Sequence, residues 1–310
     1  MADTLVSLAD MVKINDVSVV DAGATDIFND APLLRLLAAI ESSHGTDHKY
    51  LKEATAPVVG FRAPNTGVDK TASTDTLVTL NLKILDATAK MDKQLALNNP
   101  RGASYMMDRQ GRRNLRAGFR SIEEQIINGS AALGFDGFAQ ALPNTTQDMC
   151  IAKNATGASG NTSVYAVRST SDEANVCAIM GNNGNIMIDD MYETQLVDGT
   201  GKYFNGLVLP IEGWAGLQVG GSRSIARLAN VQTGASKTLT DVDLATLYGL
   251  FPEEAPPTHF VMNMRSTMQL QQSRTTYSPT GAPAPIPTEW NGIPIVMTSS
   301  VKNDETLVVA

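Results

Sequence analysis

The strongest constraint on the fold of this chain is a long predicted β-hairpin, residues 58–84, followed by a long predicted helix, residues 107–128. Apolar and polar residues alternate along both arms of the hairpin, which is the two-residue period of a β-strand. The connecting segment, residues 62–76, is rich in Ala, Pro, Gly, Thr, Asn and Asp, and connections of this length are usually functional. A hairpin and a helix of these lengths favour a protein that contacts copies of itself over a compact enzyme core.

The predicted helix carries two stripes of side chains. Positions i, i+4, i+7 and i+11 form an apolar face: Leu115, Phe119, Ile122 and Ile126. A basic stripe has nearly the same spacing: Arg109, Arg112, Arg113, Arg116 and Arg120. At about 100° per residue, the two stripes lie roughly 110° apart. The basic stripe is either a solvated face with scattered ion pairs or a surface for phosphate or for acidic patches of a neighbouring subunit.

Four other residues of this helix carry expectations of their own. Glu123 and Glu124 flank the basic stripe, and we expect them to pair with Arg116, with Arg120 or with partners from elsewhere in the chain. Gly111 and Gly118 each weaken a helix by about 1 kcal/mol relative to alanine. Their presence predicts a bend or a close contact at those points.

Composition excludes several classes of protein. A net charge of −8 and a pI of about 4.9 argue against a globally basic nucleic-acid binder. Two cysteines, Cys150 and Cys177, make neither a disulfide framework nor a zinc site, and apolar surroundings predict buried free thiols. No apolar run approaches the roughly 20 residues needed to cross a membrane, and the first residues lack a signal-peptide layout. We therefore expect synthesis in the cytosol.

The rest of the chain predicts an α+β protein with a β-rich region at residues 161–250. Expected helices cover residues 27–40, 240–250, where Thr240 and Asp243 form a capping-box variant, and 266–273. Expected strands cover residues 163–168, 176–180, 185–188, 203–211, 216–219, 258–264, 293–298 and 307–309. Residues 42–50 are polar and predicted to be irregular.

The sequence predicts no catalytic, cofactor or metal site. His44 and His48 have the spacing of two ligands on one helix face, but the residues between them favour a turn. Asp189 and Asp190 are adjacent, so on a strand they would point to opposite faces. The segment 199–202 lacks the leading glycine and trailing hydroxyl residue of a phosphate loop and is predicted to be a hairpin turn. A metal-dependent hydrolase using Asp189 and Asp190 is the less favoured alternative.

The order of elements resembles the major capsid proteins of tailed bacteriophages, which have the HK97-like fold. Two stretches are also similar to sequence patterns in one branch of that family. The first is Gly184–Asp190 followed by the turn at 199–202, and the second is Trp214–Val219 followed by Ser224–Asn230.

This resemblance implies a division of the chain into five parts. They are an N-terminal arm (1–53), an extended hairpin or E-loop (54–85), a spine helix with the first part of the peripheral domain (86–160), an axial domain (161–250) and the peripheral domain's return (251–310). The E-loop would lie over a neighbouring subunit through Phe61, Arg62, Lys70, Val78 and Leu80. Only about fifty residues precede the hairpin, so assembly would need a separate scaffolding protein unless the chain has already been trimmed, and Met1 favours the separate protein.

The resemblance implies a structural protein of the virion without a cofactor. Copies would assemble through hexamers and pentamers into an icosahedral head that encloses double-stranded DNA. Further partners would be a portal, possibly a decoration protein, and the packaged DNA, bound non-specifically. The shell of an encapsulin-type compartment is the alternative on the same fold.

Overall fold

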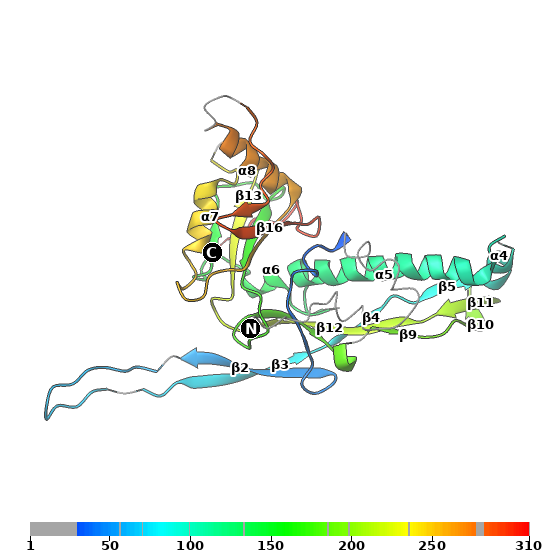
Figure 1. The fold of residues 1–310 in the computed structure, drawn as a ribbon, viewed down its shortest axis with the longest axis horizontal. Helices are drawn as coiled ribbons and strands as arrows, with labels where there is room; N and C mark the ends of the chain where they lie inside the picture. Colours follow the sequence, from blue (N-terminus) through cyan, green and yellow to red (C-terminus); the bar gives the residue numbers. More distant parts are fainter. Residues whose placement is uncertain are drawn as a thin grey trace.

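The computed structural model describes residues 30–309 except 56, 70, 99, 133, 185, 198, 235 and 277–281. The predicted α+β class is confirmed, and these described residues form four sheets and one dominant helix. Figure 1 shows three parts: a lobe with α7 (Asp241–Tyr248) and α8 (Met264–Thr276), a long layer built on α5 (Gly102–Asn128), and a projecting hairpin.

The hairpin consists of β2 (Asp47–Thr55) and β3 (Thr74–Asn81). The predicted return arm is therefore confirmed, whereas the outgoing arm was placed too late in the sequence. Residues 47–55, which were partly predicted to be irregular, pair with β3, and Val58 makes only an isolated bridge to Thr71. Pro57 interrupts the ladder because proline has no backbone N–H to donate.

Helix α5 lies along two neighbouring sheets (Figure 1). The five-stranded sheet has the order β1 (Ala39–Glu41), β8 (Val176–Met180), β12 (Ile211–Val219) and β4 (Lys83–Asp86), and β9 (Met187–Ile188) also pairs with β12. The three-stranded sheet has the order β10 (Tyr192–Val197), β11 (Tyr203–Leu209) and β5 (Ala89–Asp92). The short helix α4 (Lys93–Leu97) links β5 to α5, and a 3₁₀ turn, η2 (Asn182–Gly184), follows β8.

The two glycines of α5 lie at close contacts, which is one of the two explanations that the sequence predicted. A Cβ atom on Gly111 would lie 2.7 Å from Leu209 Cδ2, and one on Gly118 would lie 3.3 Å from Leu85 Cδ2. These small residues therefore let the helix backbone approach β11 and β4 closely. The helix starts five residues earlier than predicted and ends at Asn128, as predicted.

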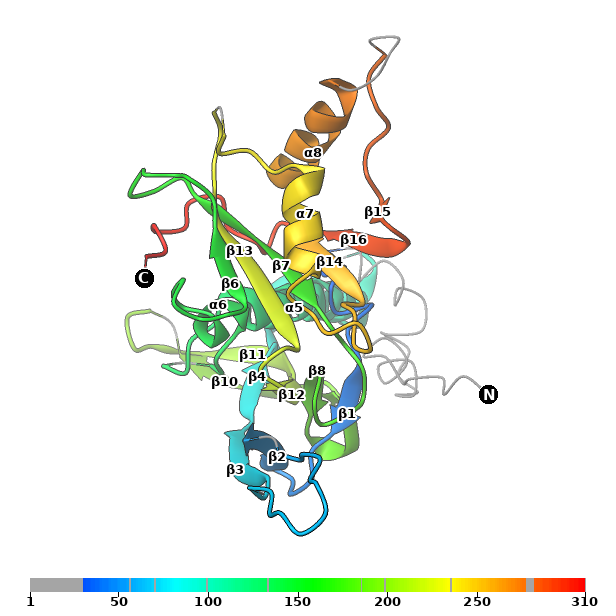
Figure 2. The same cartoon turned by 90° about the vertical axis from the view of Figure 1, so that its left-hand side faces the viewer.

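A six-stranded sheet forms the remaining lobe, together with α6 (Phe138–Ala141), α7 and α8 (Figure 2). Its order is β15 (Glu289–Trp290), β16 (Ile293–Met297), β14 (His259–Met262), β7 (Thr162–Val167), β13 (Ile225–Val231) and β6 (Cys150–Ala152). This sheet joins strands from both sides of the expected boundaries at 160/161 and 250/251. Both boundaries therefore run through one hydrogen-bonded unit.

Several smaller expectations have a clear outcome. The predicted capping box is present, since Thr240 N donates to Asp243 Oδ2 at 2.8 Å. The predicted helix at residues 27–40 is wrong over its described part, where turns lead into β1. Residues 307–309 are not a strand. Both cysteines are buried free thiols, as predicted, and burial raises the pKa of Cys177 to about 12.

Candidate functional site

The hairpin exposes large apolar side chains near its tip. The Phe61 side chain is 107% exposed and Val59 is 82% exposed, and Arg62 is also exposed. Val78 and Leu80 are half-buried and belong to the base of the hairpin, whereas Lys70 lies outside the described residues. The four described E-loop residues of the sequence analysis therefore fall in two different environments, and those near the tip contact little of their own chain.

The base of the hairpin is anchored on β12 by buried polar groups. His48 Nε2 donates to Gln218 Oε1 at 2.9 Å, and its Nδ1 accepts from Ser43 N at 3.3 Å. The Tyr50 hydroxyl donates to the Val219 carbonyl at 3.2 Å. Sequence reasoning treated His48 only as a possible metal ligand. A signal for its real environment was Gln218, a polar residue near the end of a largely apolar strand, since a buried polar side chain needs a partner.

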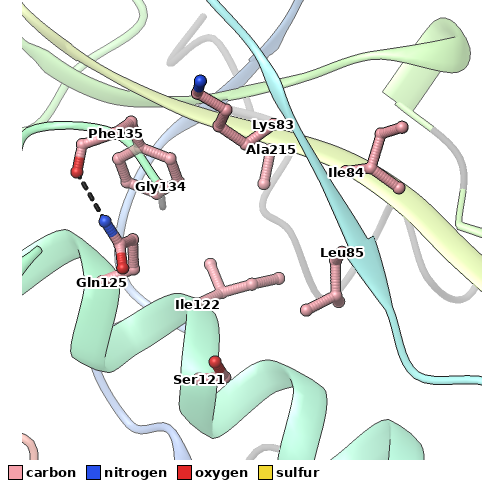
Figure 3. Close-up of a pocket in the computed structure, with 9 residues that line it drawn as sticks. All are labelled: Lys83, Ile84, Leu85, Ser121, Ile122, Gln125, Gly134, Phe135 and Ala215. Atoms are coloured by element: carbon pink, nitrogen blue, oxygen red, sulfur yellow. Dashed lines mark hydrogen bonds between the residues drawn. The ribbon is translucent and has the colours of Figure 1, made fainter. Parts of the chain in front are cut away.

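A small cavity lies between β4 and α5 (Figure 3). It has a volume of about 110 Å³ and is lined by Lys83, Ile84, Leu85, Ser121, Ile122, Gln125, Gly134, Phe135 and Ala215. Gln125 Nε2 donates to the Phe135 carbonyl at 2.7 Å and so ties the following loop to the helix. These residues offer no pair of acid and base groups.

The predicted apolar face of α5 is buried. Leu115, Phe119 and Ile126 are fully buried, and Ile122 is 5% exposed. This face of the helix therefore packs into the main hydrophobic core. Burial of this face fixes the direction in which the remaining faces of the helix point.

The basic stripe of α5 is partly paired within the chain. Arg112 contacts Asp108 at 3.2 Å, and Arg116 contacts Asp30 at 3.5 Å, both as ion pairs that solvent reaches. Arg109, Arg113 and Arg120 are exposed. Exposed pairs of this kind stabilise a protein by about 1 kcal/mol or less. The stripe therefore remains a cationic surface.

Glu123 pairs with groups from elsewhere in the chain, the second of the two predicted kinds of partner. Its side chain is fully buried, where Oε2 accepts from Leu33 N at 2.7 Å and Oε1 accepts from the hydroxyls of Thr298 and Ser300. Burial raises the pKa of this carboxyl, although the hydrogen bonds oppose the shift. Glu123 thus joins α5 to a segment before β1 and to a loop after β16. The spacing of charges could not show this, because both partners are distant in sequence.

A buried ion pair holds the C-terminal segment against the six-stranded sheet. Arg227 Nη2 lies 2.9 Å from Glu305 Oε2, and the two side chains are only 5% and 10% exposed. The same carboxylate accepts from the Ser163 hydroxyl at 2.5 Å, and Arg227 Nη1 donates to the Leu142 carbonyl at 2.8 Å. Nearby, Asn230 exchanges two hydrogen bonds with the backbone of Val308. These contacts replace the strand that was expected at the C-terminus.

The carboxylates proposed for a hydrolase are not assembled into a site. Asp189 and Asp190 are exposed, and no group of three or more potential metal ligands occurs within the described residues. Residues 199–202 lie in the turn that joins β10 to β11, as predicted. No helix in the described part of the chain has the length and apolar character needed to span a membrane.

Comparison with known proteins identifies the family. A family model described as "Major capsid protein GP7" matches residues 24–309. The chain belongs to this family of major capsid proteins. No curated protein matches it. Among solved structures, the bacteriophage Epsilon15 structure shares 18% identity and a TM-score of 0.65, covering 88% of each chain.

More distant solved structures include the bacteriophage JBD30 capsid, at 10% identity and a TM-score of 0.48, covering 84% of this chain and 88% of that one. An encapsulin complex from Synechococcus elongatus PCC 7942 has 11% identity and a TM-score of 0.41, covering 67% and 89%. The protein therefore has the HK97-like capsid fold and is a phage major capsid protein, a structural component of the virion shell rather than an enzyme.

Proposed function

We propose that copies of this chain assemble through pentamers and hexamers into a closed icosahedral phage head that encloses double-stranded DNA. The observation that carries the proposal is the hairpin, which is fixed at its base by His48 and Tyr50 but exposes Phe61 completely. Exposed apolar side chains on a projecting element mark an interaction site. Membership of the major capsid protein family supports a second copy as the partner.

The proposal assigns roles to the parts of the structure. The hairpin is the E-loop that lies over a neighbouring subunit, and α5 is the spine helix. The sheets beneath α5 belong to the peripheral domain. The six-stranded sheet with α7 and α8 forms the axial domain, so residues 259–297 move into it from the expected peripheral return. This reassignment is supported by the hydrogen bonds between β14 and β7, which make the lobe one unit.

Partners beyond the chain itself also belong to the proposal. They are a separate scaffolding protein, a portal, a possible decoration protein and DNA held without sequence preference. The support for these partners is family membership alone. The exposed arginines of α5, Arg109, Arg113 and Arg120, offer a cationic surface that scaffold, DNA or a neighbour could use.

Electron microscopy of the purified chain tests the assembly. We expect closed polyhedral particles or rings of five and six when the chain is expressed with its neighbouring phage genes. Residues 59–70 are then replaced by Asn-Gly, a two-residue turn that closes the ladder at the bridge between Val58 and Thr71. The shortened subunit should fold but assemble poorly. Normal particles from it would refute the role of the hairpin, and particles filled with a cargo enzyme instead of DNA would indicate a compartment shell.

A further inference from the structure

The buried imidazole of His48 lies at the joint between the hairpin and the body of the subunit. It is the second residue of β2, directly after residues 42–46, which connect β1 to β2. The other arm ends at the same place, because Leu82 N donates to the Thr46 carbonyl at 2.9 Å. The hairpin projects from this joint away from α5 (Figure 1). A side chain at this position can therefore control the direction of the whole hairpin.

The hydrogen bonds of His48 fix which ring nitrogen carries the proton. The Ser43 N–H points at Nδ1 from 3.3 Å, so Nδ1 is an acceptor and has no proton. Gln218 Nε2 donates to the Glu173 carbonyl at 3.0 Å and has two more carbonyls within 3.5 Å. The amide oxygen of Gln218 therefore faces His48, and the ring must donate to it from Nε2 at 2.9 Å. Both observations assign the same neutral tautomer, with its hydrogen on Nε2.

This arrangement has no place for a second proton on the ring. A proton added to Nδ1 would point at the Ser43 N–H, because an imidazolium has two donors and no acceptor. The hydrogen bond would be lost, and a buried donor would be left without a partner, which is costly. Imidazole side chains take up their second proton near about pH 6.5. The conflict therefore arises at mild acidity.

The titratable groups on the neighbouring strands do not compensate a charge on His48. Tyr50 of β2 stacks on the imidazole with ring centroids 6.0 Å apart, and burial raises the pKa of its hydroxyl. Cys177 of β8 is the register partner of Gln218, and burial raises the pKa of its thiol to about 12. Both groups are therefore neutral where imidazole titrates. The residue of β3 opposite His48 is the apolar Leu80.

The charged groups around the joint are turned to solvent. Alternation in β2 directs Asp47 and Lys49 to the opposite face of the hairpin from His48. His44 Nδ1 contacts the Ser43 hydroxyl at 2.8 Å. Within the described residues, no carboxylate forms an ion pair with His48. The charged or titratable side chains of the adjoining loops, and those next to His48 in β2, are exposed or half-buried: His44, Asp47, Lys49, Asp172 and Glu173.

Other contacts at the base of the hairpin do not depend on this proton. Leu82 is 4% exposed and packs with Cys177 and Ile179 in a small apolar cluster. A Cβ atom on Gly216 would lie 2.6 Å from Leu82 Cδ2, so β12 packs closely against this end of the hairpin. Loss of the hydrogen bond to His48 would therefore loosen the start of β2 without detaching the hairpin or unfolding the subunit.

We infer that His48 is a pH-sensitive joint, whose neutral ring holds the start of β2 on β12 and whose protonated ring releases it. The anchored state binds fewer protons than the released state. Anchoring is therefore complete above the ordinary titration range of imidazole and is lost as the pH falls through that range. The released hairpin can take directions that the anchored hairpin cannot. A consequence for assembly rests on the proposed function, whereas the release itself does not.

Hydrogen exchange of unassembled subunits tests the release. Exchange of the β2 amides is measured between about pH 7.5 and pH 5 and corrected for the intrinsic dependence of exchange on pH. We expect opening of β2 to increase by up to roughly tenfold per pH unit, which is the limit for one linked proton. Amides of β7, in the lobe, should show no such increase. Opening of β2 that is independent of pH, or that β7 follows equally, would overturn the inference.

Replacement of single histidines identifies the group responsible. His48→Gln keeps an amide donor for Gln218 but takes up no proton, so opening of β2 should no longer depend on pH. His44→Gln changes an exposed histidine of the same turn and should keep the full dependence. Undiminished dependence in His48→Gln would overturn the inference.

The unaltered chain provides a second test that needs no variant. It has only three histidines, so ¹⁵N labelling of the imidazoles resolves each tautomer by nuclear magnetic resonance. We expect His48 to carry its hydrogen on Nε2 at about pH 7.5. A hydrogen on Nδ1 would overturn the inference. Absence of particles at every pH would instead contradict the proposed function, and the exchange experiment would still decide the role of His48.

Discussion

Removal of the buried carboxylate of Glu305 should destabilise the subunit strongly. Glu305→Ala leaves the Arg227 guanidinium, whose side chain is 5% exposed, without its anion, although the hydrogen bond to the Leu142 carbonyl remains. Breaking a buried pair by removal of one partner costs about 3–5 kcal/mol, because an uncompensated charge stays buried. Since domains of this kind unfold with about 5–15 kcal/mol, this is a large fraction of the total. Urea unfolding of unassembled subunits, followed by circular dichroism, measures the loss.

Two comparisons separate this effect from a general effect of losing a carboxylate. Asp304→Ala removes the exposed neighbouring carboxylate and should change stability by less than about 0.5 kcal/mol. Glu193→Ala breaks the Lys93–Glu193 pair, whose side chains are 32% and 45% exposed, respectively, and should cost about 1 kcal/mol at most. The double variant Arg227→Met with Glu305→Leu should lose less than Glu305→Ala alone. If Glu305→Ala cost no more than Glu193→Ala, the reasoning about the buried charge would be refuted.

Three further outcomes are expected in the same unfolding assay. Phe119→Ala should cost about 3–5 kcal/mol, because the ring is fully buried in the core. Gly118→Ala should be neutral or slightly stabilising, since alanine favours the helix by about 1 kcal/mol, whereas Gly111→Ala should destabilise because its Cβ would lie 2.7 Å from Leu209. Burial raises the pKa of Glu123, so the folded subunit holds this proton more tightly than the unfolded chain does. Stability should therefore fall as the pH rises from the ordinary value of 4.5 through the raised value, and Glu123→Gln should weaken this dependence.

Periodic patterns predicted the elements that depend on local sequence. The spacing of Leu115, Phe119 and Ile126 identified the buried face of α5, and the alternation from Val78 to Ile84 identified the return arm of the hairpin. Thr240 and Asp243 gave the start of α7 because a capping box is a contact between residues close in sequence. Such features need no knowledge of the tertiary fold.

Contacts between distant residues could not be obtained in this way. Strand β2 reads as polar because the alternate side chains that it buries at its base, His48 and Tyr50, carry polar groups, so no apolar alternation marks it. Glu123 has the spacing of a surface residue in an ion pair, but its partners Leu33 and Thr298 are 90 and 175 residues away. Pairing across an expected domain boundary could not be predicted for the same reason, since β14 joins β7 across almost a hundred residues of intervening chain.

The buried polar groups stabilise the fold of the subunit, whereas the part of the hairpin that is proposed to contact other subunits contains few buried groups. Arg227, Glu123 and His48 each tie together segments that are distant in sequence, and each is buried in its own chain. The hairpin beyond its anchored base contributes few buried contacts, and a two-stranded ribbon alone is marginally stable in water. A neighbouring subunit can therefore stabilise the conformation of the hairpin tip without changing the core. The groups that fix the core lie at the base of the hairpin or in the body of the subunit. This separation lets one folded subunit occupy neighbouring positions in a shell whose contacts differ slightly.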